Sequence, residues 1–230
     1  METASDNRFD SVVDIDFATN LLLEVAQERS LNGLMEKFVS TCMKRPQIAR
    51  MEFWLIEKGD ICSRCPQRPR CPDQTRCLHL VAAGNNPVPG SGHGATRIYN
   101  SDERIPLGAG VIGKVAATGQ AVELYNVDKD PAQLAGVNWS PSEGLRGFAA
   151  TAVTFRDEIL GAFAFFTRFN PPKEGSTWRR IFADHIGGAV ANARAFEEIQ
   201  RLKAQLEVHN TYLQEEVVEA RAFGELVGQS

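Results

Sequence analysis

The sequence lacks long apolar runs, and this absence excludes a membrane-spanning helix. No stretch of the 230 residues approaches the roughly 20 apolar residues that a bilayer requires. The N-terminus, METASDNRFDSVVDID, also lacks the basic and apolar regions of a secretory signal peptide. We therefore expect a cytoplasmic protein without a membrane partner.

Positive charge is not in excess, and recognised catalytic motifs are missing. The 25 Lys and Arg residues are outnumbered by 29 Asp and Glu residues, and no basic stripe with interleaved aromatics or helix-turn-helix signature is present. The glycines Gly108, Gly110 and Gly113 have G-x-G-x-x-G spacing, but they lie outside any βαβ unit and no Walker lysine accompanies them. We expect no direct nucleic-acid binding, no ATPase activity and no other catalytic activity in this chain.

Cysteine is nearly absent outside one short segment. Cys42 alone lies elsewhere, in the apolar stripe of a predicted helix, which indicates a buried core thiol. The other four follow the pattern C-x2-C-x5-C-x5-C within sixteen residues: Cys62, Cys65, Cys71 and Cys77. This spacing lets one loop bring four thiolates around a tetrahedral zinc ion or an iron–sulfur cluster.

Disulfide bonds are the competing interpretation of the four clustered cysteines. They are disfavoured because cytosolic thiols are normally kept reduced. Between residues 60 and 77 there are four arginines and two aspartates, a surplus of two positive charges that would offset either metal centre. Proline follows Cys65 and Cys71, as it does at both kinds of site, while the single C-x2-C knuckle slightly favours a cluster over zinc. His79 could replace a thiolate, but its alternation with leucines indicates an ordinary strand residue.

Helical ends surround a β-rich middle. Periodicity predicts one helix over residues 16–28 and a second that Ser30 caps and Pro46 ends. The strands ARMEFWLIEKG and RCLHLVAAG then form a hairpin that the cysteine loop interrupts. The segment NNPVPGSGHGATRIYNSDE, which includes His93, is predicted to be a long exposed connection.

The second half of the domain contains a short helix and a long hairpin. A strand, a glycine-flanked helix over residues 111–118 and a strand over 121–124 are predicted in RIPLGAGVIGKVAATGQAVEL. Two apolar runs flank a polar turn at residues 156–158 in GFAATAVTFRDEILGAFAFFTR. Both runs are apolar on both faces, which predicts central strands.

The order of these segments resembles a GAF domain over residues 21–198. The segment RIPLGAGVIGKVAATGQAVELYNVDKDP resembles the strand, short helix and strand of that family, and GLRGFAATAVTFRDEILGAFAFF is similar to its central hairpin. The segment SLNGLMEKFVSTCMK matches the helix before its first strand. The resemblance implies an α+β fold with a six-stranded antiparallel sheet, helices on one face and a small-molecule pocket on the other. The cysteine loop departs from the family pattern as an insertion.

The resemblance also implies a lid over residues 126–146 that covers an unidentified small-molecule ligand. Within the lid, Trp139 could stack on a ligand and Arg146 could bind an anion, although a hydrophobic plug and a surface charge are equally consistent. Phe148 and Phe163 point either into this pocket or into the core, and periodicity does not distinguish the two.

One long helix is predicted from about Ser176 to the C-terminal region. It carries a heptad seam with two polar breaks: Ile199, Leu202, Leu206, His209, Leu213, Glu216, Ala220 and Phe223. Nothing else in the sequence is left to bury this seam, which predicts a parallel homodimer. The expected organisation is a flexible N-terminus (1–15), a GAF sensory domain (16–198) with a cysteine-rich insertion (60–77), a signalling coiled-coil helix (199–222) and a linker (223–230).

The last residues, FGELVGQS, resemble the entry into the ATPase of sigma-54-dependent transcriptional activators. This resemblance implies downstream ATPase and DNA-binding domains in the full-length protein. Our leading hypothesis is a sensor that binds a small ligand, a cysteine-bound metal centre or both, and signals through the dimeric helix. The alternatives are a GAF-type enzyme that reduces free methionine sulfoxide, and a ligand sensor in which zinc only stabilises the loop.

Overall fold

The computed structural model describes residues 15–88, 96–99, 101–134, 137, 139, 143–170 and 175–227. Residues 1–14 of the predicted flexible N-terminus, His93 in the predicted exposed connection and residues 228–230 of the predicted linker lie outside the described residues, whereas Ile15 begins the first helix. No helix in the described ranges is both long enough and apolar enough to cross a membrane.

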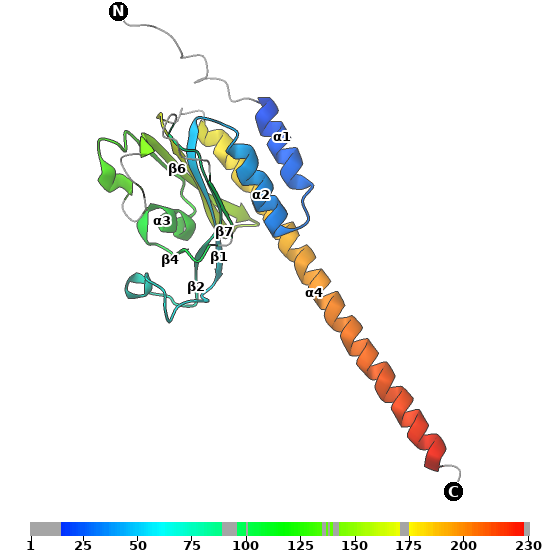
Figure 1. The fold of residues 1–230 in the computed structure, drawn as a ribbon. Coiled ribbons are helices and arrows are strands. Elements are labelled where there is room, and N and C mark those ends of the chain that lie inside the picture. Colours follow the sequence, from blue (N-terminus) through cyan, green and yellow to red (C-terminus); the bar gives the residue numbers. More distant parts are fainter. Residues whose placement is uncertain are drawn as a thin grey trace, which may run out of the picture.

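An antiparallel sheet forms the centre of the domain (Figure 1). The described strands are β1 (Ile48–Lys58), β2 (Arg76–Asn85), β3 (Thr96–Tyr99), β4 (Arg104–Ile105), β5 (Val122–Tyr125), β6 (Gly147–Phe155) and β7 (Glu158–Thr167). Their spatial order is β3-β2-β1-β7-β6-β5, and the short β4 also pairs with β2. The prediction of an α+β fold with an antiparallel sheet is confirmed.

Helices lie on both faces of this sheet, but unequally (Figure 1). The helices are α1 (Ile15–Ala26), α2 (Leu31–Cys42), α3 (Gly110–Thr118) and α4 (Gly175–Val227), with short 3-10 turns η1 (Arg68–Arg70) and η2 (Pro131–Leu134). The two N-terminal helices and the first part of α4 cover one face, whereas α3 lies on the other. The long C-terminal helix predicted from the sequence is therefore present.

The sheet separates two hydrophobic cores because its central strands are buried on both sides. On the helix-covered face, the rings of Phe38, Phe53 and Phe163 are in mutual contact, with centroid separations of 5.7–6.3 Å. On the α3 face, Phe148 and Phe166 meet edge to face at 5.0 Å. The apolar faces that the sequence predicted are thus filled on both sides of the sheet.

Local sequence signals account for several of the turns and helix ends. Ser30 caps α2 as predicted, since its Oγ accepts a hydrogen bond from the Gly33 amide at 3.1 Å. The β6–β7 loop has positive φ at Arg156 and Asp157 (48° and 66°), the backbone twist that suits a two-residue hairpin. The segment after Gly84 was predicted to be only an exposed connection, and this prediction is wrong in part. Some of its residues form β3, which pairs with β2.

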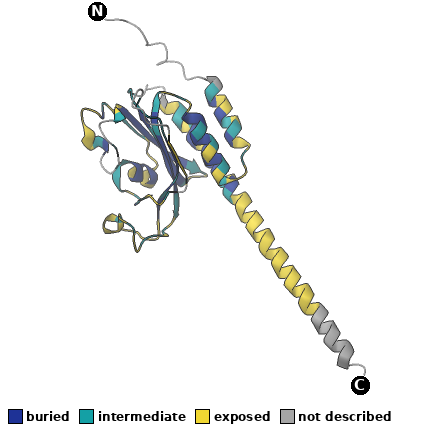
Figure 2. Ribbon diagram, viewed as in Figure 1, coloured by how far each residue is buried: buried dark blue, intermediate teal, exposed yellow. Residues whose placement is uncertain are grey.

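Helix α4 packs closely on β6 and then leaves the domain. A Cβ on Gly187 would lie 1.9 Å from the Thr154 carbonyl oxygen, so glycine permits this approach. The helix is exposed from about Phe196 to Val217, as the yellow part of Figure 2 shows. It therefore belongs to the domain core over its first part only.

Candidate functional site

The cysteine loop connects β1 to β2 and brings the four predicted thiols to one place. They line a cavity of about 20 Å³ together with Asp60, Arg104 and Pro106. The Gly59 amide donates to the Thr75 carbonyl at 2.9 Å and closes the base of the loop. Cys77 is buried at the start of β2, while the other three cysteines are half-buried. A loop excursion from one hairpin therefore supplies all four sulfur atoms.

Two of the thiols donate hydrogen bonds to the loop backbone. Cys62 Sγ lies 3.2 Å from the Gln74 carbonyl oxygen, and Cys71 Sγ lies 3.2 Å from that of Asp73. With the side chains so placed, no group of three or more His, Cys, Asp or Glu residues in the described ranges could hold a metal ion. A thiolate cannot donate and is repelled by a carbonyl oxygen, so deprotonation favours turning both sulfur atoms away from these carbonyls.

A charged group lies next to the cysteines. Arg104 donates two hydrogen bonds to Asp60, at 3.0 Å from Nε and 2.7 Å from Nη2, and these hold the pKa of that carboxyl well below its usual range. Burial raises the pKa of the Cys77 thiol to about 11, and the positive charge of Arg104 opposes this rise. The charge of Arg104 would stabilise thiolates, while the paired Asp60 carboxylate acts against it.

His79 lies beside this ion pair and does not join it through a hydrogen bond. Its Nε2 is 3.6 Å from Asp60 Oδ1, and this buried nitrogen has no hydrogen-bond partner among the described residues. It lies on β2 opposite Leu55, in the strand position that the sequence predicted.

Glycine is required where the loop leaves β1. A Cβ on Gly59 would lie 2.5 Å from Cys62 Sγ and 2.7 Å from the Gln74 carbonyl oxygen. Neither distance occurs in real structures, so the Cys62 thiol occupies the space that a side chain would fill. The absence of a Cβ at this position lets the first cysteine fold back over the base of the loop.

An ion pair connects the base of the loop to α4. Glu57 is the cross-strand neighbour of Cys77 in the β1–β2 register. Its carboxylate pairs with the Arg194 guanidinium, which also lies 3.4 Å from the Ile56 carbonyl oxygen. The strand end that bears the cysteine loop is therefore in direct contact with the long helix.

A larger cavity of about 660 Å³ adjoins the cysteine loop. Its walls include Gln67, Arg70, Pro106, Lys114, Val122 and Gln133. Two of these residues, Gln67 and Pro106, also line the cysteine cavity. Sequence reasoning missed this site, although the loop arginines and the lysine on an exposed helix face were visible signals.

The pocket residues predicted from the sequence are not brought together. Phe163 is fully buried on the helix-covered face, whereas Phe148 is fully buried in the core on the opposite face. Trp139 packs partly against the second core, and Arg146 is exposed. None of the four lines either cavity described above. The two phenylalanines are core residues.

Comparison with known proteins supports the fold but identifies no ligand or activity. No protein-family profile and no curated protein matches the sequence. Among solved structures, the chain is similar to the GAF domain of an Acinetobacter phosphoenolpyruvate-protein phosphotransferase, with 15% identity, a TM-score of 0.54, and coverage of 82% of this chain and 99% of that one. The GAF domain of the Coxiella burnetii phosphotransferase gives 17% identity, a TM-score of 0.53, and coverage of 79% and 94%.

An enzyme with the same fold is equally similar. Free methionine-R-sulfoxide reductase from Neisseria meningitidis, solved in complex with its substrate, has 15% identity and a TM-score of 0.55. The alignment covers 79% of this chain and 90% of that one. These likenesses show that the chain has the GAF fold, which a reductase and a domain of two phosphotransferases share.

Proposed function

We propose that this chain is a sensory domain in which the cysteine loop holds a metal ion and α4 passes the signal to an output domain. The observation that carries the proposal is the common cavity of Cys62, Cys65, Cys71 and Cys77 at the end of a hairpin that is ion-paired to α4. A sensor needs a site whose occupancy changes and a rigid element that responds. Both are adjacent here.

The size of the cavity favours a single ion over a cluster. A space of about 20 Å³ accommodates about one water-sized particle. Four thiolates suit tetrahedral zinc, and iron is the alternative ion for the same donor set. When bound, zinc would supply a redox-inert cross-link that stabilises the loop, whereas iron would supply a redox-active centre. An iron–sulfur cluster, which the cysteine spacing slightly favours, would require the loop to open.

The Glu57–Arg194 ion pair is the proposed route to the helix. Rotation of the thiols toward a metal would move the base of the loop, where Cys77 and Glu57 face each other across two strands. Because Glu57 contacts Arg194, any shift of the strand end changes the energy of this contact with α4. Metal occupancy and helix position are then thermodynamically linked.

A second copy of the chain is the proposed partner of the exposed helix. Leu206 is 68% exposed and Ile199 60% exposed, although both occupy predicted core positions of the heptad seam. His209 and Glu216 are the exposed polar breaks, and the side chains of Ala220 and Phe223 lie outside the described residues. A parallel coiled coil buries such a seam against its own copy.

The output is proposed to be a transcriptional one. Helix α4 continues to Val227 and reaches the segment that resembles the entry into a sigma-54-type ATPase. A helix that projects away from the domain is suited to position such an ATPase and its DNA-binding domain. The test is whether a protein that contains this chain together with ATPase and DNA-binding domains binds DNA and hydrolyses ATP in a manner that depends on the cysteines.

Metal analysis tests the centre itself. The 230-residue chain, purified without oxygen, is assayed for zinc, iron and sulfide and by absorption spectroscopy, beside Cys65→Ser and Cys42→Ser variants. We expect one ion per chain that is lost in Cys65→Ser and retained in Cys42→Ser. Iron with stoichiometric sulfide would replace the single ion with a cluster, and absence of any metal would overturn the metal centre.

A reductase is the second candidate because the Neisseria enzyme shares the fold. That chemistry requires a thiolate in contact with the substrate. No cysteine is among the residues that line the larger cavity, and the smaller cavity has room for little more than an ion. We therefore expect no turnover of free methionine-R-sulfoxide when the reduced chain is assayed with a thiol reductant.

A further inference from the structure

The larger cavity beside the cysteine loop has the composition of a binding site for an organic anion. It lies between the loop, the start of α3, β5 and η2, outside the hydrophobic core that fills the space between α3 and the sheet. Its volume of about 660 Å³ is within the range typical of small-molecule sites. A molecule larger than a simple inorganic ion would fit.

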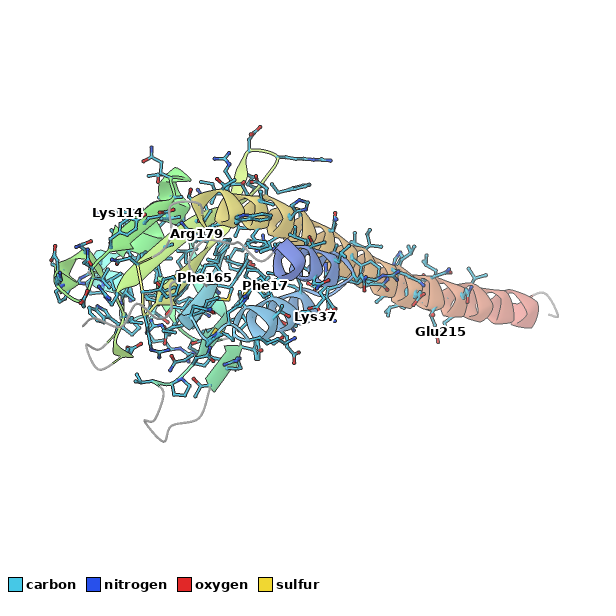
Figure 3. The ribbon with its side chains drawn as sticks, turned by 90° about the horizontal axis from the view of Figure 1, so that it is seen from above. Phe17, Lys37, Lys114, Phe165, Arg179 and Glu215 are labelled. Atoms are coloured by element: carbon cyan, nitrogen blue, oxygen red, sulfur yellow. The ribbon has the colours of Figure 1, made fainter. Side chains whose placement is uncertain are left out.

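Two cationic side chains line this cavity, and no carboxylate is among the described residues that line it. Arg70 comes from the cysteine loop and Lys114 from the exposed face of α3. Within the described ranges, neither side chain forms an ion pair or a hydrogen bond. Figure 3 shows Lys114 on α3, on the side of the molecule away from Lys37 on α2. Two uncompensated positive charges on one cavity favour an anionic ligand.

The rest of the lining is largely apolar. Ile105, Pro106, Val111 and Val122 form much of the wall. Such surfaces bind the non-polar body of a ligand, while arginine and lysine bind its carboxylate or phosphate group. The first residues of α3 add backbone amides, since its N-cap Ala109 has no side chain that could accept from them.

We propose that this cavity binds a small organic anion, a carboxylate or phosphate ester with an apolar portion, and that this ligand is an input signal of the domain. The proposal rests on the proposed function for its signalling role, although not for binding itself. Gln67 and Pro106 line both cavities, and Arg70 is adjacent in sequence to Cys71. Metal binding that orders the cysteine loop therefore fixes one wall of the ligand site.

The test uses phenyl phosphate as the probe. Phenol, which lacks the charged phosphate, and inorganic phosphate, which lacks the apolar ring, are the comparison compounds. Binding to the full chain is measured by calorimetry at fixed ionic strength, and metal content is measured on the same samples. The variants are Arg70→Gln and Lys114→Gln. The matched controls are Arg64→Gln, on the same loop, and Lys129→Gln, which precedes η2; neither residue lines the cavity.

We expect saturable binding of one phenyl phosphate per chain, weakened about tenfold or more in each cavity variant because a charge-assisted contact is lost. The controls should bind within about twofold of the natural chain. Equal binding of phenol, equal binding of inorganic phosphate, equal loss in the controls, or no binding would each overturn the proposal. If the chain purifies without any metal and still binds phenyl phosphate, the anion site is retained and the metal centre of the proposed function is overturned.

Discussion

The five cysteines carry the same functional group in different surroundings. Cys42 is 2% exposed within the first hydrophobic core, and burial raises its pKa far above the usual range. Cys62, Cys65 and Cys71 are partly accessible in the loop. Because the thiolate is the reactive species, accessibility and pKa together determine which cysteine reacts.

Alkylation of the native, metal-free chain should distinguish these groups. We expect iodoacetamide to modify Cys62, Cys65 and Cys71 first, Cys77 more slowly and Cys42 last. The modification rate of Cys42 should be about a hundredfold or more lower in the native chain than in the unfolded chain. Mass spectrometry of quenched samples gives the order. Early modification of Cys42 would show that the helix-covered core opens readily, contrary to its burial.

The contact between Glu57 and Arg194 should matter for coupling more than for stability. Their side chains are 42% and 31% exposed, so Glu57→Gln should change the free energy of unfolding by less than about 1 kcal/mol. We expect metal removal to alter hydrogen exchange in α4 of the natural chain and not in Glu57→Gln. Arg201→Gln, which removes the exposed pair with Glu198 on α4 itself, is the control and should respond normally. If metal removal altered hydrogen exchange in α4 of Glu57→Gln as much as in the natural chain, this route would be refuted.

At the scale of elements, two adjacent glycines on α4 differ in whether the structure leaves room for a side chain. A Cβ on Gly187 would lie 1.9 Å from the Thr154 carbonyl oxygen of β6, whereas a Cβ on Gly188 would meet nothing within 4 Å. Gly187→Ala should destabilise the chain by roughly 1–3 kcal/mol, because α4 must move away from the sheet. Chemical denaturation provides the measurement.

The neighbouring substitution is the matched control. Gly188→Ala should stabilise the chain by roughly 0.5–1 kcal/mol, because alanine favours the helix and the space is open. If both substitutions had the same effect, the close approach of α4 to β6 would not be the cause.

Elements with strong local signals could be predicted from the sequence. The Ser30 cap, the β1–β2 hairpin and the β6–β7 hairpin all follow from side-chain chemistry and periodicity, and the structure confirms them. β3 could not be recognised because its four residues are all exposed at the sheet edge and show no alternation of burial. Its pairing with β2 depends on contacts that are distant in sequence.

The candidate site, too, could be predicted from the sequence only in part. The cysteine spacing predicted that four thiols would meet, and they share one cavity. The assignment of Phe148 and Phe163 could not be made, since both strands are apolar on both faces and the period of two does not tell which face is covered. The larger cavity was missed because no local pattern connects the segments that line it, which are the cysteine loop, the start of α3, β5 and η2.

For the whole molecule, assembly is the main expectation. Leu206→Glu places a charge at a core position of the seam and should convert a dimer into a monomer. Val208→Glu is the control, because Val208 is 72% exposed and lies off the seam. Light scattering across a concentration series measures both. A monomeric natural chain would overturn the proposed homodimer, whereas equal effects of both substitutions would exclude the heptad seam as its interface.

The long helix also determines how far a small local change is transmitted. Arg194 contacts the domain, and 33 residues of α4 follow it to Val227 (227 minus 194). At 1.5 Å per residue this part of the helix is about 50 Å long. A tilt of about 5° at the Arg194 contact would therefore displace the far end by roughly 4 Å, a lever ratio that converts a sub-ångström shift beside the cysteines into a movement of side-chain size.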